Sequence, residues 1–354
     1  MLVRNIYING AACISAQYTF DETFFDENII EKHTGYRNAL SPDYKQYLNA
    51  TASRRFSRLI KMSLVAAQKS ISMAAISMPE AIITGTGLGC LEDTEKFLLS
   101  MIESNEMLLS PTAFIQSTHN TISGQIAMML SCNYPNYTYS SRYFSFESSL
   151  LDGLLMLGDN SAENVMVNAA DEITPSIHTI TKQLGIWDRN ECILNKNSLA
   201  VTAGEGVVSL ILSKVQNSTS LARIAGLKLC FNLLTEQSIE KLIHEFLEEC
   251  NIKTSDIDVV ILGMNGEAES DQYYNNVSAL FSSSSLVVYK HLFGEMFTSS
   301  AFSYWLSAHI IHKRKIPLSC LLNDKTPAKI KNILIYNQFR GKYHSLCLMT
   351  NVEV

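Results

Sequence analysis

Hydrophobic and polar positions along this chain follow two periods. Short apolar runs that end at glycine or acidic residues indicate buried strands, and longer segments with apolar residues three or four positions apart indicate helices. Strands are expected at residues 3–8, 81–89, 137–141, 164–172, 203–212, 221–229 and 258–263, with a hairpin at 333–337 and 344–349. Helices are expected at 53–75, 91–103, 121–130, 150–157 and 239–250, and the segment 290–312 is expected to carry a turn into a long helix. Strands that alternate with helices in this way predict a layered α/β fold.

The alternation of strands and helices starts again after about residue 220. We therefore expect two successive halves, residues 1–220 and residues 221–354, that pack into one body. The chain has 354 residues, of which 47% are hydrophobic and 18% charged, so it can bury a large core and is not expected to be disordered.

Charge and cysteine usage exclude several classes of function. The net charge of -6, with no basic stripe interleaved with aromatic residues, argues against a nucleic-acid partner. No apolar run reaches the roughly 18 residues of a membrane span, and the N-terminal residues alternate like a strand rather than a signal peptide, so no membrane partner is expected. The cysteines show neither a CxxC pair nor the spacing of a zinc site, which predicts free thiols, no metal and a cytoplasmic protein. They are Cys13, Cys90, Cys132, Cys192, Cys230, Cys250, Cys320 and Cys347.

One dense basic stretch opens the first long helix and contains Arg54, Arg55, Arg58 and Lys61. A charged run of this kind is ordinarily a solvated helical face. The alternative is a docking patch for an acidic partner.

The central stretch, residues 140–157, changes from a strand into a helix with leucines at helical spacing. Such a turn can aim a side chain into a crevice, where the free N–H groups of the helix start stabilise an oxyanion. The turn itself reads Arg142-Tyr143-Phe144-Ser145-Phe146-Glu147 and contains no cysteine.

Four stretches in a fixed order carry a resemblance to a known family. They are residues 84–89 (TGTGLG), 123–127 (SGQIA), 165–167 (VMV) followed by Asp171-Glu172, and 204–206 (GEG). In order and spacing, they resemble the β-ketoacyl synthases. The resemblance implies a five-layered α-β-α-β-α thiolase fold and a dimer through the strand before the central turn, with residues 136–140 at the interface. It implies no cofactor and no metal.

The chemistry of β-ketoacyl synthases uses a cysteine at the central turn and two histidines that stabilise an enolate. The matching positions here are Tyr143, or Phe144 in the alternative register, with Asn265 and Glu295 at the histidine positions. Lys290, Gly294 and Glu205 match retained family residues. A carboxylate would repel an enolate, and a tyrosine, phenylalanine or glutamate at the turn is a poor acyl acceptor, so we expect no catalytic residue and no condensation by this chain alone.

Members of this family that lack the cysteine include the chain length factors, and this sequence resembles those of bacterial aryl-polyene and flexirubin-type pigment clusters, most of all at residues 144–153. The resemblance implies pairing with an active ketosynthase and an acyl carrier protein that docks on Arg54, Arg55, Arg58 and Lys61. The bulky turn is then expected to shape the acyl tunnel and to close its end across the interface. The tunnel residues would be Tyr143, Phe144, Phe146 and Glu147.

Two alternatives remain open at this stage. In the first, the turn plugs a degenerate crevice and the protein is a homodimer without acyl chemistry. In the second, it is an acyltransferase with a rearranged site, in which His119, His291 or Cys90 acts as base or nucleophile.

Overall fold

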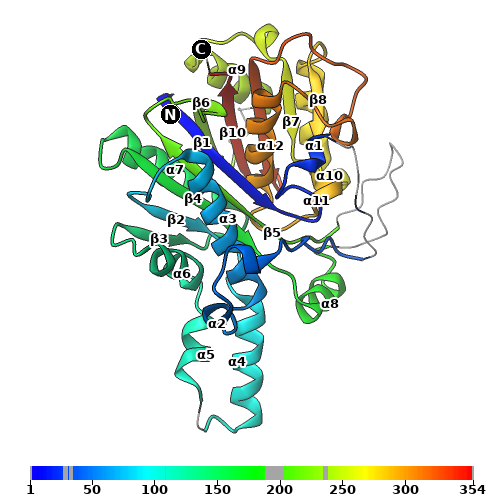
Figure 1. The fold of residues 1–354 in the computed structure, drawn as a ribbon. Helices are drawn as coiled ribbons and strands as arrows, with labels where there is room; N and C mark the ends of the chain where they lie inside the picture. The colour runs from blue at the N-terminus through cyan, green and yellow to red at the C-terminus, as the bar shows by residue number, and fades with distance from the viewer. Residues whose placement is uncertain are drawn as a thin grey trace.

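The structure is a computed structural model that describes residues 2–26, 31, 35–107, 109–187, 202–233 and 238–352. Within these residues, ten strands form a single sheet in the order β3-β2-β4-β5-β1-β6-β10-β9-β7-β8 (Figure 1). The strands are β1 (Leu2–Ile14), β2 (Ile82–Gly85), β3 (Asn136–Tyr139), β4 (Asn164–Asp171), β5 (Gly206–Ser213), β6 (Ala222–Phe231), β7 (Val259–Leu262), β8 (Ser285–Val288), β9 (Asn332–Phe339) and β10 (Tyr343–Thr350).

The strand order repeats from the centre of the sheet outward. The first five strands run β1-β5-β4-β2-β3 toward one edge, and the last five run β6-β10-β9-β7-β8 toward the other. The antiparallel pair of β1 and β6 joins the two sets at the centre. The proposed boundary at residue 220 lies in the connection between β5 and β6, and the division into two halves stays a prediction.

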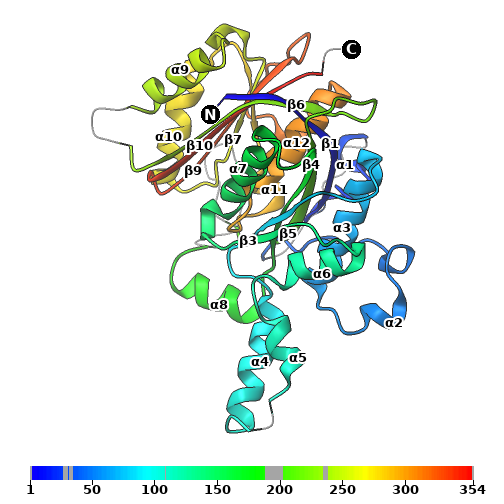
Figure 2. The ribbon, with the colours of Figure 1, turned by 90° about the vertical axis from the view of Figure 1, so that its left-hand side faces the viewer.

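Helices cover both outer faces of the sheet and fill the space between its two parts (Figure 2). They are α1 (Thr23–Asp26), α2 (Ala50–Ser53), α3 (Arg58–Ala74), α4 (Leu91–Glu103), α5 (Pro111–Gln116), α6 (Thr121–Leu130), α7 (Ser145–Gly158), α8 (Pro175–Gln183), α9 (Ile239–Glu249), α10 (Ala268–Leu280), α11 (Lys290–Phe293) and α12 (Ser300–Lys313).

Three apolar clusters define the layers. The largest joins α7 and α12 to the inner faces of both parts of the sheet. A second joins α3 and α6 to the outer face of the β1 to β5 part, and a third joins α9 and α10 to the outer face of the β6 to β10 part. Side chains of β4 alternate accordingly, with Val165 and Val167 in the inner cluster and Met166 in the outer one. The predicted α-β-α-β-α layering is therefore confirmed.

Several predicted boundaries were wrong for identifiable reasons. The first strand does not end at Asn9-Gly10 but continues to Ile14 through a shift in register, because Gly10 lets the backbone of Ser70 in α3 approach closely. The helix expected at 53–75 is interrupted, since α2 ends at Ser53 and α3 starts at Arg58. By contrast, the segment 290–312 has the expected turn into a long helix, since α11 ends before Gly294, whose φ of 85° is left-handed, and α12 starts at Ser300.

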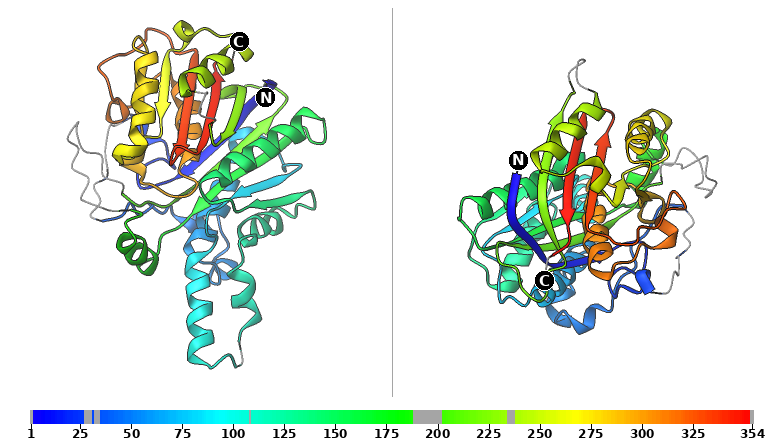
Figure 3. Two further views of the ribbon diagram at one scale, coloured as in Figure 1. Left: turned by 180° about the vertical axis from the view of Figure 1, so that it is seen from behind. Right: turned by 90° about the horizontal axis from the view of Figure 1, so that it is seen from above.

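Helices α4 and α5 form a hairpin that stands away from the body of the molecule (Figure 3). The predicted bounds of α4 and of α6 were right to the residue, whereas α8, α10 and strand β8 were missed. Helices in the described part of the chain lack the combination of length and apolar composition that a bilayer crossing requires.

Candidate functional site

The central turn lies where the sequence placed it, between β3 and α7. A short 3-10 turn, Arg142–Phe144, leads into α7 at Ser145. The Ser145 hydroxyl accepts a hydrogen bond from the Ser141 N–H (2.8 Å) and donates one to the Arg142 carbonyl (2.6 Å). Behind the turn, Gly85 of β2 leaves just enough space for the backbone of Ser145, so the turn is held rigidly against the sheet.

Tyr143 fills the crevice into which this turn points. Its ring stacks on Phe339 with the ring centroids 3.5 Å apart and lies 4.7 Å from the ring of Phe297. Trp187 packs on the other side of Phe297 at 5.6 Å. Burial and the nearby Glu295 carboxylate raise the pKa of Tyr143 above its ordinary value, so the hydroxyl stays protonated and is a poor nucleophile.

The space that remains in the crevice is small. Its volume is about 20 Å³, and its walls include the rings of Tyr143, Phe144, Phe297, Phe339 and Tyr343. A single water molecule needs roughly 10–15 Å³ measured in this way, so the crevice has room for about one water and none for an acyl chain.

The two positions that match the family's histidines meet in this structure. Asn265, after β7, donates a hydrogen bond from Nδ2 to Glu295 Oε2 over 3.0 Å. Glu295 also accepts two hydrogen bonds from Lys290 Nζ, at 2.8 and 3.1 Å, and one from the Ser299 hydroxyl at 2.6 Å. Lys290 and Glu295 form a buried ion pair with side chains 8% and 4% exposed.

This arrangement pairs the polar groups at the two matching positions with each other and with Lys290. The Nδ2 donor of Asn265 already binds Glu295, and the Lys290 ammonium is held by both carboxylate oxygens. Asn265, Lys290, Ser299 and Glu295 form a hydrogen-bonded polar cluster, and Tyr143, the third matching position, lies in the aromatic stack nearby. The geometry therefore supports a structural role for residues that do chemistry in active synthases.

Glu147 is an acidic side chain of the crevice that is only partly paired. Its Oε1 accepts a hydrogen bond from Ser345 (3.3 Å), and its Oε2 has no partner among the described atoms. Burial raises the pKa of Glu147 to about 7. Phe146, beside it, is fully buried and contacts Tyr304 with a centroid distance of 4.9 Å.

The retained family residues hold backbone in place. Gly294 packs so closely on Gly204 that a Cβ would come within 2.5 Å of the Gly204 Cα. Glu205 accepts hydrogen bonds from the backbone N–H groups of Ala39 (2.9 Å) and Ile173 (3.3 Å) and forms an ion pair with Arg58. These contacts join the end of β5, the 35–40 loop and α3.

The residues of the basic stretch differ in exposure, because Arg58 forms the ion pair with Glu205. Arg54 and Arg55 are exposed, Lys61 is half-buried, and Arg58 is engaged with Glu205 and the Ala39 carbonyl. Docking of a carrier protein on these four residues stays a prediction.

The residues of the acyltransferase alternative do not form a site. Cys90 is fully buried, and burial raises the pKa of its thiol, which disfavours the thiolate. His291 Nε2 lies 2.9 Å from the Ser319 carbonyl, and burial lowers the pKa of this imidazole to about 4. His119 is exposed. The other described cysteines are unpaired, and Cys192 lies outside the described residues.

Some residues that close the crevice were not predicted as site residues. Phe297 and Ser299 lie between α11 and α12, in the segment 290–300 that resembles the family's second histidine segment, but no role was assigned to them. Phe339 lies in the stretch 337–342, where the family's Gly-rich loop is replaced, and this departure was the available signal. No group of three or more His, Cys, Asp or Glu side chains gathers as a metal-binding cluster in the ranges that the structure covers.

Comparison with known proteins agrees with this geometry. Residues 31–225, more than half of the chain, match the family model "Beta-ketoacyl synthase, N-terminal domain". The chain belongs to the β-ketoacyl synthase family. A search of curated proteins found no match.

Solved structures with the same fold cover nearly the whole chain. The ishigamide ketosynthase/chain length factor has a TM-score of 0.80 at 14% identity, covering 99% of this chain and 100% of its own. The ketosynthase ApeO in complex with its chain length factor ApeC, from Xenorhabdus doucetiae, has a TM-score of 0.79 at 14% identity, with 98% of each chain covered. A β-ketoacyl synthase from Burkholderia phymatum has a TM-score of 0.76 at 12% identity, with 100% of each chain covered. These likenesses confirm the thiolase-like fold.

Proposed function

We propose that this chain is a chain length factor, a non-catalytic subunit that pairs with an active ketosynthase and shapes the tunnel of the growing acyl chain. The observation that carries the proposal is the closed crevice. Tyr143 occupies it, and Asn265 and Glu295 bind each other where two catalytic histidines would stand. The likeness to solved ketosynthase/chain length factor complexes supports it.

A partner surface is available at the edge of the sheet. Strand β3 pairs with β2 on one side, and its other side is the end of the sheet. Around this edge Tyr137 is 49% and Met128 74% exposed, and Tyr134 and Leu155 are also exposed. An open edge strand surrounded by apolar side chains is a surface that another chain covers.

The α4–α5 hairpin extends the apolar surface of the molecule. It exposes six large apolar side chains. They are Leu98, Leu99, Ile102, Met107, Phe114 and Ile115. We propose that the partner ketosynthase covers the β3 edge and part of this hairpin, in an obligate interface of more than about 2,000 Å².

Within the crevice, the predicted tunnel residues lie at different depths. Tyr143 and Phe144 are half-buried, whereas Phe146 and Glu147 are fully inside the core. We propose that Tyr143 and Phe144 form the stop for the acyl chain and that Phe146 supports them from behind. A rigid ring is a suitable stop because it buries well and holds its shape.

The proposal also includes a docking site for an acyl carrier protein and a location in the cytoplasm. Arg54 and Arg55 are the exposed members of the basic stretch and are proposed to contact an acyl carrier protein, with Lys61 beside them. Arg58 would support this docking site indirectly, because its contacts with Glu205 and the Ala39 carbonyl hold the start of α3 in place. Unpaired thiols are in keeping with a cytoplasmic location.

Co-expression with a ketosynthase that retains cysteine and both histidines tests the proposal. We expect a stable heterodimer that extends acyl chains to one main length. Phe144→Ala should lengthen the products without slowing the first condensation, whereas Phe231→Ala, which removes an exposed ring from the other side of Tyr343, should not. If the chain forms a homodimer and does not bind the co-expressed ketosynthase, the proposal is contradicted and the homodimeric pseudoenzyme is favoured.

A further inference from the structure

A cationic groove lies at the end of the sheet where α12 ends. Two neighbouring cavities, of about 610 and 370 Å³, share Gln216, Asn351 and Val352 in their walls and so form one groove. The groove lies between the β5–β6 connection, the last turn of α12 and the start of β9. It is separate from the crevice and from the edge strand β3.

Basic side chains line both cavities. His312 and Arg314 border the larger cavity, and Arg223 and Lys331 border the smaller one. No Asp or Glu side chain lines either cavity, and none forms an ion pair with Arg223, Arg314 or Lys331 among the described residues. In a chain with a net charge of -6, this is a local concentration of unneutralised positive charge.

The smaller cavity is built on a rigid row of strand residues. Tyr7, Arg223, Thr350 and Asn332 are successive register partners across β1, β6, β10 and β9. Arg223 Nε donates a hydrogen bond to Thr350 Oγ1 over 3.0 Å, which fixes the guanidinium. The nearby Asp258 is occupied, because its Oδ2 accepts the N–H groups of Lys331 and Asn332 at 2.7 and 2.9 Å.

The larger cavity adds an apolar floor. Leu221, Ile311 and Ile330 border it and are themselves buried. Hydrogen bonds from Asn9 Nδ2 to the Val215 carbonyl (3.0 Å) and from Ser220 Oγ to Asn9 Oδ1 (2.7 Å) hold the β5–β6 connection that forms its wall. The groove therefore offers fixed cations around a small apolar surface.

The geometry points to an acidic segment of another protein as the ligand of this groove. Carboxylates of such a segment would pair with Arg314, Lys331 and the held Arg223, and one apolar side chain would reach the floor. The basic side chains are divided between two cavities, so a single phosphate would leave some of them unpaired, and concave walls do not match a flat lipid surface. This goes beyond the proposed function, since nothing in the pairing with a ketosynthase requires it.

The position of the groove separates its ligand from the crevice. Ser300, at the start of α12, lines the crevice, and Arg314, just after its end, lines the groove. The 14 residues of α12 span about 21 Å, so a segment bound in the groove does not contact the turn. Its role would be to tether a partner.

The test uses the full chain and a short fluorescein-labelled peptide of glutamates with a central leucine. Fluorescence anisotropy should show binding that weakens as salt is raised. The double variant Arg314→Glu/Lys331→Glu should weaken the affinity at least about tenfold. Both side chains are exposed, so folding should be unaffected, and far-UV circular dichroism checks this.

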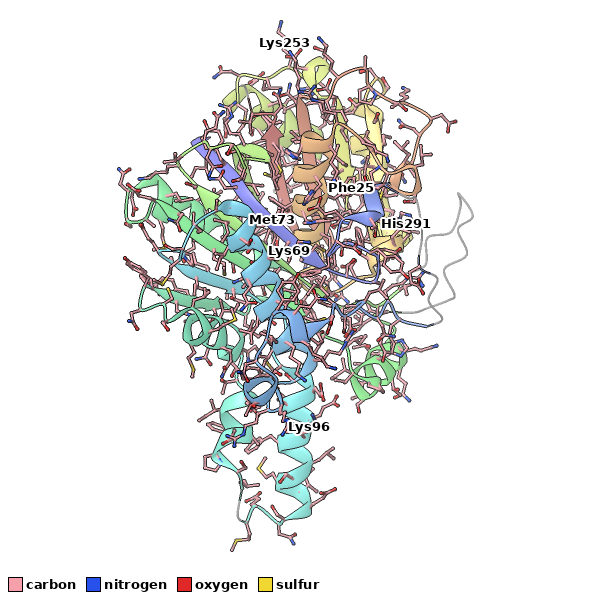
Figure 4. The ribbon with its side chains drawn as sticks, in the orientation of Figure 1. Phe25, Lys69, Met73, Lys96, Lys253 and His291 are labelled. Carbon is pink, nitrogen blue, oxygen red and sulfur yellow. The ribbon has the colours of Figure 1, made fainter. Side chains whose placement is uncertain are left out.

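A matched double variant, Lys96→Glu/Lys241→Glu, changes the net charge by the same amount at exposed positions that do not line the groove. It should keep full affinity. Figure 4 shows Lys96 on the α4–α5 hairpin, well below Lys253 in that view. Replacing the peptide's leucine by serine should weaken binding a few-fold. Equal losses in the two double variants would overturn the inference. So would binding of anionic lipid vesicles that is lost in Arg314→Glu/Lys331→Glu while the peptide does not bind.

Discussion

The crevice beneath the central turn and the edge of strand β3 lie at the two ends of the same short segment, yet they are built in opposite ways. In the crevice, rings stack and the polar groups at the former histidine positions bind one another. At the edge, the backbone of β3 and large apolar side chains face outward. The crevice is filled by its own side chains while the sheet edge stays open, which is the combination that the proposed function requires.

The polar groups of the crevice differ among themselves. The Lys290–Glu295 pair is neutral as a unit and surrounded by hydrogen bonds, whereas Glu147 has an oxygen without a partner among the described atoms. Removing one partner of the Lys290–Glu295 pair would leave a buried charge without its counter-charge. Glu147 makes the stability of the fold depend on pH.

Removing the cation of the buried pair should have the largest effect. Lys290→Met leaves the Glu295 carboxylate buried without its counter-charge, which costs about 3–5 kcal/mol in the free energy of unfolding. Urea denaturation of the purified chain measures it. Lys96→Met, at an exposed pair with Glu92, is the control and should cost less than about 1 kcal/mol. Equal losses would mean that the buried cluster is not a stabilising unit.

Glu147 should produce the next largest effect, visible as a change with pH. In the unfolded chain this carboxyl ionises near 4.5, but burial keeps it protonated in the folded chain until about pH 7. The stabilisation is therefore complete below about pH 4.5 and is lost as pH rises through 7. Glu147→Gln removes this pH-dependent contribution to the free energy of unfolding.

Relative to the wild type, the stability of Glu147→Gln should rise by up to about 3 kcal/mol between acidic and mildly alkaline pH, which urea denaturation at a series of pH values measures. Burial also raises the pKa of Glu172 to about 8, and this residue should contribute the same change of stability with pH to the wild type and to Glu147→Gln. Glu269→Gln, at an exposed position, should follow the wild type. Parallel curves for all three proteins would show that Glu147 does not titrate in this way.

A charge at the sheet edge should weaken assembly while leaving the chain folded. Tyr137→Asp places a carboxylate in the apolar surface around β3, and we expect about a fiftyfold loss of affinity for the ketosynthase by isothermal titration calorimetry. Leu184→Asp, on the exposed side after α8, is the matched control. If both variants bind equally well, the interface lies elsewhere.

The smallest effect should come from the amide that binds the ion pair. Asn265→Ala removes one hydrogen bond to Glu295 and should lower the free energy of unfolding by about 1–2 kcal/mol. Asn275→Ala, exposed on α10, should change it by less than about 0.5 kcal/mol. Thermal unfolding of the two variants side by side would separate these values, and a stable Asn265→Ala would show that the amide is dispensable.

Regular helical segments were predictable because their apolar residues recur at helical spacing, even in α4, where Leu98, Leu99 and Ile102 are exposed. The bounds of α4 and α6 follow from apolar spacing and from the glycines and serines beside them. Helix α10 was missed because it is mostly polar, with Tyr274 and Val277 among its few buried apolar residues. Strand β8 has four residues after a run of serines and gives almost no periodic signal.

For the candidate site, the sequence indicated residues but not their contacts. The match of Asn265 and Glu295 to the family's histidine positions stays a prediction from motif order, and the structure joins these two residues by a hydrogen bond. The stacking of Tyr143 on Phe339 depends on how the β9–β10 turn lies over the crevice, a contact between residues far apart in the chain. The engagement of Arg58, which separates it from the exposed residues of the basic stretch, could not be predicted either. Its ion-pair partner Glu205 is far away in the chain and comes close only in the folded state.

The central claim is that this chain assembles with a synthase but performs no acyl chemistry itself. Intact-mass spectrometry of the reconstituted pair, after incubation with an acyl carrier thioester, tests both parts in one experiment. The account predicts an acyl adduct on the ketosynthase alone and an unmodified mass for this chain. A stable adduct on this chain, at Tyr143 or any other residue, would contradict it.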